Sequence, residues 1–297
     1  MLITPSPLIK VGKYCTHSTS KMNSPDISRR SFCKWSSSLV LAGIFTGLKN
    51  RLVLALDPAP PGHRLTDIHT PMLILPATTR NGNHVPVVVK MNHPMELDHY
   101  IRRVEFRNES DPIPSKGIFH PTAANGETYL AFQARMDSGT STVLAIAECN
   151  LHGTWTARHR ITIPDGQGGC ATVAVPKEAA AIEEIVPPVI RIPELVRRGR
   201  LTKGEMAEVQ VKFKHPSKTG LAYKDKKFFQ IEEPLYVISM QVLYGDRLVS
   251  RYEMTAGLSD NPFLKFKLKF TEEKPIRVVF TNSRGRQFSS STAVILS

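Results

Sequence analysis

Long stretches of helical periodicity are missing from this 297-residue sequence, and no glycine-rich loop precedes a long helix. Nucleotide-binding folds cradle phosphate with such a loop, so its absence disfavours nucleotide binding. Glu232 and Glu233 are adjacent in the sequence and are not placed on opposite sides of a site, so they do not support general acid–base catalysis. No conventional active site is assembled by these patterns, and we expect a protein that is not an enzyme.

The ten histidines lack the spacing typical of a metal site. His93, His99, His120 and His215 are scattered along the chain, and most of them lie beside proline or in loop-like segments. We therefore expect turn or surface positions for these side chains, and neither a bound metal ion nor a cofactor.

The net charge of +13 is concentrated near the N-terminus, which argues against nucleic-acid binding. Residues 1–55 hold eight Lys or Arg and one Asp, a net +7 of the total. The remaining +6 is modest for about 240 residues, so we expect no nucleic-acid partner. The lysines at 265, 267 and 269 fit a solvated sheet face better than a docking site for an acidic partner.

The charged N-terminal segment resembles a twin-arginine export signal. Residues 28–34 read Ser-Arg-Arg-Ser-Phe-Cys-Lys, an apolar run follows at 39–45, and Val-Leu-Ala at 53–55 suits a signal peptidase. The apolar run is too short to span a bilayer, and no cysteine follows it closely, so no membrane anchor is expected. We predict that residues 1–55 are a signal peptide directing the chain to the periplasm, with Met1 and Met22 both open as the start.

After a proline-rich lead-in at 56–82, short segments rich in β-branched and aromatic residues predict strands. Apolar and polar residues alternate in several of them, which indicates strands covered on one face. Gly245-Asp246 and residues 283–286 predict hairpin turns. Residues 177–184 favour one or two helical turns. The pattern predicts an all-β chain of two antiparallel β-sandwiches joined by a flexible linker, with strands at 85–91, 100–107, 128–136, 142–149, 154–163, 236–244 and 247–254.

Cys170 is the most informative single residue, because it follows Gly168 and Gly169 between a strand-like segment and the linker. Glycine opens many backbone states, so we expect the flanking glycines to be flexible and the thiol to be reachable. Such a thiol suits covalent attachment of a substrate. The alternative is that the glycines only make a turn and the cysteine is incidental.

Once the leader is removed, two cysteines remain, Cys149 and Cys170. Cys149 ends a segment that reads as a buried strand, which favours a small core residue. In an oxidising compartment the alternative is a Cys149–Cys170 disulfide. A nucleophilic enzyme based on Cys170 is disfavoured, because no histidine or acid lies nearby in the sequence to activate it.

Two sets of motifs resemble the SoxY and SoxZ families of bacterial thiosulfate oxidation. Residues 83–172 are similar to SoxY, and residues 189–297, after a linker at 173–188, are similar to SoxZ. The SoxY-like motifs lie at 85–89, 94–95, 98–101, 111–114 and 168–170; the SoxZ-like motifs lie at 215–220 and 259–264.

This resemblance implies two immunoglobulin-like sandwiches and a periplasmic carrier that holds sulfur intermediates covalently on Cys170. Separate periplasmic enzymes would act on the carried group: Sox-type cytochromes, a sulfatase-like hydrolase or a quinoprotein dehydrogenase. The oligomeric state is left open.

One feature departs from the SoxY pattern. The family ends in Gly-Gly-Cys-Gly-Gly, whereas Cys170 is followed by Ala171-Thr172-Val173 and a second domain. The departure suggests a fused SoxYZ-like subfamily associated with quinoprotein dehydrogenases. It also raises an alternative function, that of a non-covalent accessory module for such a dehydrogenase.

Overall fold

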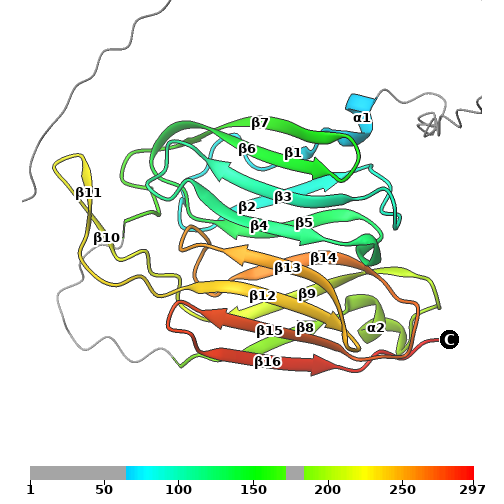
Figure 1. Ribbon diagram of the computed structural model, residues 1–297. Coiled ribbons are helices and arrows are strands. Elements are labelled where there is room, and N and C mark those ends of the chain that lie inside the picture. Colours follow the sequence, from blue (N-terminus) through cyan, green and yellow to red (C-terminus); the bar gives the residue numbers. More distant parts are fainter. Residues whose placement is uncertain (1–64, 172–183) are drawn as a thin grey trace, which may run out of the picture. The chain divides into compact units, whose positions relative to one another are not determined.

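The computed structural model describes residues 65–171 and 184–297, here called the first half and the second half. Nearly all regular structure is β, as predicted, and it forms two large antiparallel sheets and a separate two-stranded hairpin (Figure 1). The eight-stranded sheet has the order β16 (Gln287–Thr292), β15 (Ile276–Asn282), β12 (Val237–Tyr244), β13 (Arg247–Met254), β4 (Ser115–Pro121), β3 (Ile101–Asn108), β6 (Gly139–Cys149), β7 (Gly153–Ile163). The six-stranded sheet has the order β1 (Met72–Ile74), β2 (Val85–Met91), β5 (Thr128–Ala134), β14 (Phe263–Lys269), β9 (Met206–Lys214), β8 (Val186–Arg191).

Both sheets continue from the first half into the second. Strand β4 pairs with β13 in one sheet, and β5 pairs with β14 in the other. At the first of these joints Phe119 lies opposite Tyr252, and their rings stack with centroids 4.6 Å apart. At the second, Leu130 lies opposite Phe266. The two halves therefore share one hydrophobic core between the layers.

The predicted strands are confirmed to within a few residues, and 85–91 is matched at both ends by β2. The strands could be predicted because buried and exposed side chains alternate along them. Val85, Val87 and Val89 are buried on β2, whereas Pro86 faces solvent. The same period places Phe266 and Leu268 of β14 in the core and Lys267 on the outer face. Both predicted hairpin turns are present, at 245–246 and 283–286.

Several short elements were not predicted, because their sequences lack a clear period. Strand β4 contains Gly117 and ends at Pro121, which weaken a strand pattern. The others are α1 (Leu65–His69), α2 (Pro193–Arg198), the 3-10 helix Ala123–Asn125 and the hairpin of β10 (Leu221–Lys224) and β11 (Lys227–Gln230), besides the edge strands β1 and β8.

The predicted linker is described only at its end, where residues 186–188 belong to β8 rather than to a connection. The rest of it, most of the predicted helical turns and the export signal lie outside the described residues and stay predictions. The domain limits and the immunoglobulin-like detail also stay predictions. In the described ranges, the helices are too short to cross a membrane.

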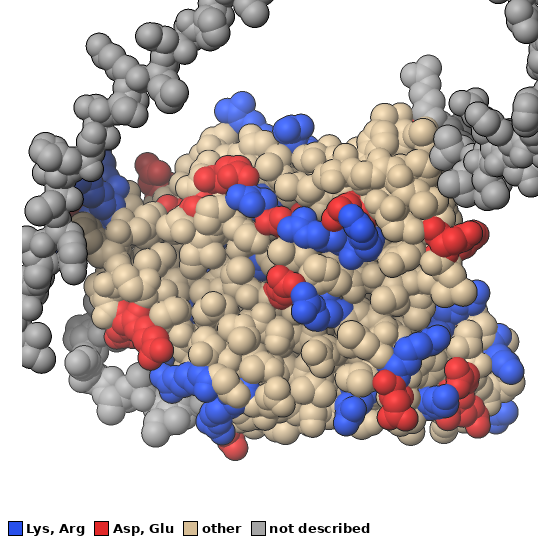
Figure 2. All heavy atoms as spheres, in the orientation of Figure 1, with Lys and Arg blue, Asp and Glu red and all other residues tan. Residues whose placement is uncertain are grey.

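Charged side chains of both signs are interspersed on the surface shown in Figure 2. On the eight-stranded sheet many of them form ion pairs, such as Arg102 with Glu148 and Arg103 with Glu105, each at 2.5 Å. On the six-stranded sheet Lys265 lies 3.7 Å from Glu208 of the neighbouring strand. This mixture is typical of solvated sheet faces.

The shared core predicts one cooperative unfolding transition. Phe266 is fully buried on β14, between β5 and β9. Phe266→Ala should lower the free energy of unfolding by about 3–5 kcal/mol. Urea titrations followed by far-UV circular dichroism and by tryptophan fluorescence, to which Trp155 of the first half contributes, should shift together.

The matched control is Val196→Ala on α2, where the side chain is 64% exposed. It should change stability by no more than about 0.5 kcal/mol. Two separated unfolding transitions would show that the halves fold independently. A urea midpoint by fluorescence that is the same for Phe266→Ala and the native protein would show the same.

Candidate functional site

Cys170 is buried at the end of the first half, so the predicted exposed thiol is wrong in this conformation. Its residue exposure is only 1%. The segment that leads to it leaves β7 and turns back over residues 82–83 and 136–138. Backbone hydrogen bonds hold this segment: Gly82 N–H donates to Gln167 O at 2.9 Å, and Gly169 N–H donates to Met136 O at 2.8 Å.

The glycines beside Cys170 serve close packing, which differs from the predicted flexible flank. A Cβ at Gly169 would lie 2.4 Å from the carbonyl oxygen of Gly82. A Cβ at Gly168 would lie 2.4 Å from Asp137 Oδ1 and 2.7 Å from the backbone nitrogen of Ser138. No side chain fits at these distances, so glycine lets the segment lie directly against its neighbours.

Arg135 and Thr219 donate hydrogen bonds that hold the cysteine segment against both halves of the molecule. The Arg135 guanidinium donates to Asn83 Oδ1 at 2.7 Å and to Gly169 O at 3.1 Å, and it pairs with Asp260 at 2.5 Å. The Thr219 hydroxyl donates to the carbonyl oxygen of Cys170 at 2.9 Å. Cys170 therefore lies at the junction of the two halves.

A buried ion pair lies near the thiol. Lys116 and Asp111 are 0% and 1% exposed at their side chains, and Lys116 Nζ is 2.6 Å from Asp111 Oδ2. Lys116 also donates to Ile113 O at 2.8 Å, and the backbone of Asp137 donates to Asp111 Oδ1 at 2.9 Å. Each charge thus has partners that replace lost solvation.

Burial raises the pKa of the Cys170 thiol to about 12. Lys116 and Arg135 oppose this rise, while Asp111 and Asp137 add to it. Burial also raises the pKa of Asp137. At neutral pH the buried thiol therefore stays protonated, and a protonated thiol is a poor nucleophile.

Cys149 and Cys170 are both free, so the alternative of a disulfide is excluded for this structure. The predicted burial of Cys149 is confirmed, at 2% exposure. It ends β6 beside the turn to β7, whereas Cys170 follows the far end of β7. The length of β7, roughly 30 Å at 3.3 Å per residue, separates the two ends of this strand.

The segments that resemble SoxZ meet beside Cys170 through their own hydrogen bonds. The backbone of Ser217 donates to Asp260 Oδ1 at 2.7 Å, and the backbone of His215 donates to Asn261 Oδ1 at 3.1 Å. Asp260 in turn holds Arg135, which contacts the cysteine segment. Motifs far apart in the sequence thus form one connected structure around the thiol.

Comparison with family models supports the same division of the chain. Residues 67–170 match the model of the sulfur oxidation protein SoxY, and residues 196–293 match the model of the sulphur oxidation protein SoxZ. The chain is a fused SoxY–SoxZ-type protein. The first half is from here on the SoxY half, and the second half is the SoxZ half. No curated protein matches the chain.

Among solved structures, the SoxY–SoxZ chain is similar over about a third of its length to superoxide reductases. For the enzyme from Ignicoccus hospitalis the identity is 31%, with 32% of this chain and 80% of that chain covered and a TM-score of 0.29. For the superoxide reductase from Nanoarchaeum equitans the identity is 20%, with 33% of this chain and 96% of that chain covered and a TM-score of 0.29. For a putative superoxide reductase from Thermotoga maritima the identity is 23%, with 33% of this chain and 88% of that chain covered and a TM-score of 0.28.

Two of the histidines that were expected in turns or on the surface are buried instead. His93 is 5% exposed and His215 is 0% exposed. His215 packs against Phe280, and its Nε2 lies 3.2 Å from Asn282 Nδ2. His120 is a half-buried partner of Glu253 at 3.0 Å.

His93 belongs to a second cluster in the SoxY half that sequence reasoning missed, formed by His69, His93, His99, Cys149 and His152. Burial lowers the pKa of His69 and His99 and lowers that of His93 to about 4, which favours neutral imidazoles with free lone pairs. The sequence did contain a signal, since His93 and His99 are six residues apart and Cys149 and His152 are three apart.

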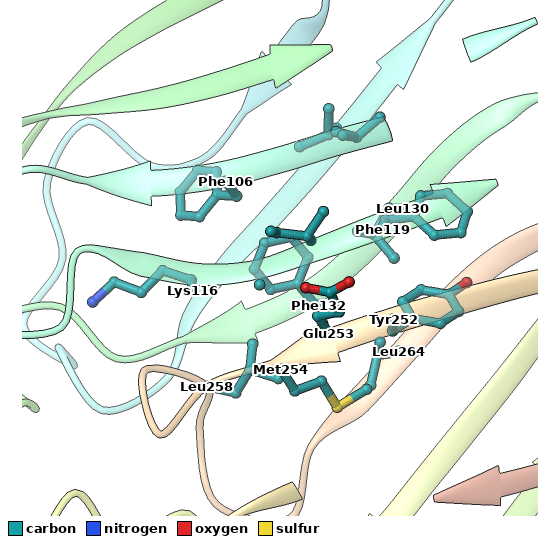
Figure 3. A pocket seen from close by; sticks show the side chains of 14 residues that line it. Phe106, Lys116, Phe119, Leu130, Phe132, Tyr252, Glu253, Met254, Leu258 and Leu264 are labelled. Carbon is teal, nitrogen blue, oxygen red and sulfur yellow. The ribbon is translucent and has the colours of Figure 1, made fainter. Parts of the chain in front are cut away.

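A small cavity lies between the sheets where the two halves join (Figure 3). Its volume is about 20 Å³, and side chains such as Phe106, Phe132 and Leu264 line it. Figure 3 shows Lys116 pointing away from these rings. Because the space suits about one water molecule, it is a gap in the core rather than a substrate site.

The buried ion pair generates a stability prediction. Lys116→Met would leave Asp111 buried without its cation and should lower the free energy of unfolding by about 3–5 kcal/mol. Adding Asp111→Asn should recover much of this loss, because the uncompensated charge is removed. Chemical denaturation of both variants measures the difference.

Lys265→Met is the matched control, since Lys265 is 33% exposed and lies 3.7 Å from Glu208. Its effect should stay below about 1 kcal/mol. If Lys116→Met lowers the free energy of unfolding by an equally small amount, groups other than Lys116 compensate the buried charge of Asp111.

Proposed function

We propose that this Sox sulfur-oxidation protein is a periplasmic carrier that stores Cys170 in a closed, protected state and loads it when the segment at residues 164–171 opens. The observation that carries the proposal is the convergence of the SoxY-like and SoxZ-like motifs on this free thiol. Partner redox enzymes would act on the opened segment, so the protein itself needs no active site.

Opening would change the chemistry of the thiol. Its raised pKa comes first from burial, so exposure to water returns it toward the ordinary value of about 8.5. Joining the Cys170 sulfur to a thiosulfate sulfur forms one S–S bond, releases the thiol proton and passes an electron pair to an oxidised partner enzyme. The closed site holds the thiol at 1% exposure between close-packed backbones, so the loaded form is the open one.

The non-covalent accessory module for a quinoprotein dehydrogenase is the second candidate, and the burial of Cys170 favours it. In that case the Cys170 segment joins the two halves and carries nothing. The two candidates differ in whether the segment opens while the rest of the protein stays folded, and in whether Cys170 carries a group.

Thiol labelling tests this opening. Native protein should react slowly with a maleimide at Cys170, with a rate that rises with pH. Gly169→Ala should open the segment, because its Cβ would overlap Gly82 O, and we expect labelling roughly 10–100 times faster for a strain of about 1–3 kcal/mol. Peptide mass spectrometry would give the rate at each cysteine.

Gly166→Ala is the control, since a Cβ there meets no atom of the described residues within 4 Å and only a positive φ is strained. It should accelerate labelling by less than about tenfold. Equal rates for Gly169→Ala and the native protein would count against a segment that opens.

Carriage itself is tested by mass spectrometry of protein isolated from cells that oxidise a reduced sulfur compound. Cys170 should carry added sulfur atoms or a sulfonate group, and Cys149→Ser should keep the adduct whereas Cys170→Ser should lose it. An unmodified Cys170, together with undiminished sulfur oxidation in the Cys170→Ser strain, would leave the accessory module as the function.

A further inference from the structure

Five side chains with metal-binding atoms meet at the end of the SoxY half remote from Cys170. They come from the end of α1, the connection between β2 and β3, the end of β6 and the turn into β7. We propose that these side chains bind one divalent first-row transition-metal ion, with His69, His99, Cys149 and His152 as ligands and His93 as the fifth.

The donor atoms are already close enough for one ion. One ligand atom from each of the first four residues lies within 4.8 Å of all the others. Donors that share an ion at about 2.0–2.3 Å are at most about 4.6 Å apart, so only shifts of a few tenths of an ångström are needed. His69 Nε2 is 3.0 Å from His152 Nδ1, which is 3.6 Å from Cys149 Sγ.

The four imidazole rings form a closed cycle. Centroids are 4.6 Å apart for His69 and His93, 4.5 Å for His93 and His99, 4.9 Å for His99 and His152, and 4.7 Å for His152 and His69. His69 and His99, on opposite sides of the cycle, are 5.8 Å apart. His93 thus completes the cycle between two of the ligands.

Hydrogen bonds to carbonyl groups set the tautomers of two rings. His69 Nδ1 donates to Leu65 O at 2.6 Å, and His93 Nδ1 donates to Pro94 O at 2.5 Å. Each bond places the proton on Nδ1 and leaves a lone pair on Nε2. Metal-binding histidines are oriented by bonds of this kind.

Two ring nitrogens of the cluster lack hydrogen-bond partners in the described part of the chain. His93 Nε2 and His99 Nε2 are buried, and neither has a hydrogen-bond partner among the described residues. Cys149 Sγ accepts the backbone N–H of Leu151 at 3.4 Å, an arrangement that suits a thiolate ligand. Buried polar atoms without partners are costly, and a cation bound by the lone pairs of these rings would remove that cost.

The donor set indicates the class of ion. Imidazole and thiolate suit borderline or soft transition metals and not Mg²⁺ or Ca²⁺. Structural zinc usually takes four ligands, so five donors favour an ion that accepts five or six, such as Fe²⁺. His99 and His152 are partly exposed, so solvent can reach the site.

Metal binding to the full chain tests the proposal. Protein stripped with a chelator should bind one equivalent of Co²⁺ or Fe²⁺, with a thiolate-to-metal charge-transfer band. Cys149→Ser should lose the band, whereas Cys170→Ser keeps every donor and should retain it. His99→Ala should weaken binding at least tenfold, and His93→Ala should change the visible spectrum.

His120→Gln is the histidine control, since that residue pairs with Glu253 outside the cluster, and it should bind as the native protein does. Because Cys149 is buried, a second readout guards against misfolding of its variant. Metal at a hundredfold excess over Kd should raise the Tm of the native protein by roughly 5–10 °C but not that of His99→Ala, which alters a partly exposed side chain.

No binding of Co²⁺, Fe²⁺ or Zn²⁺ at micromolar concentration, or equal binding by the native protein and His99→Ala, would overturn the metal site. The result is independent of the carrier proposal. Loss of adducts from Cys170 leaves the metal spectrum untouched, and loss of the metal leaves the labelling of Gly169→Ala untouched.

Discussion

Strand pairing across the two halves is the constraint on which the rest of the structure depends. The β4–β13 and β5–β14 ladders join residues more than a hundred positions apart, and they align Phe119 with Tyr252 and Leu130 with Phe266. The same alignment brings Arg135, at the end of β5, to Asp260. The surroundings of Cys170 are therefore a product of the joint between the halves, and neither half provides them alone.

The two candidate sites use burial in opposite ways. Around Cys170, burial keeps the thiol protonated, and hydrogen bonds satisfy the backbone that covers it. Around His93, burial keeps imidazoles neutral and leaves their nitrogens short of donors. Backbone hydrogen bonds thus hold the segment around Cys170 in place, whereas His93 Nε2 and His99 Nε2 lack hydrogen-bond partners among the described residues.

Much of the fold could be predicted from alternation, because a strand with one buried face has a period of two that is visible in residues such as Val85, Val87 and Val89. Strand β4 could not, since Gly117 and Pro121 obscure the period. Of the site around the thiol, only the cysteine itself could be predicted from the sequence, and its contacts could not. Cys170 was identified, but local sequence cannot show that Gly169 packs on Gly82 or that Thr219 holds the cysteine carbonyl. The histidine cluster depends on contacts between distant turns, and residue-by-residue reading treats each turn separately.

The buried pair of Lys116 and Asp111 has an evolutionary consequence. Losing either residue alone leaves a charge in the interior, so single replacements pass through an unstable intermediate protein. Descendants of this chain should therefore keep both residues or exchange both together. An aligned set of relatives would display this as covariation between the two columns, even in lineages whose cysteine has been lost.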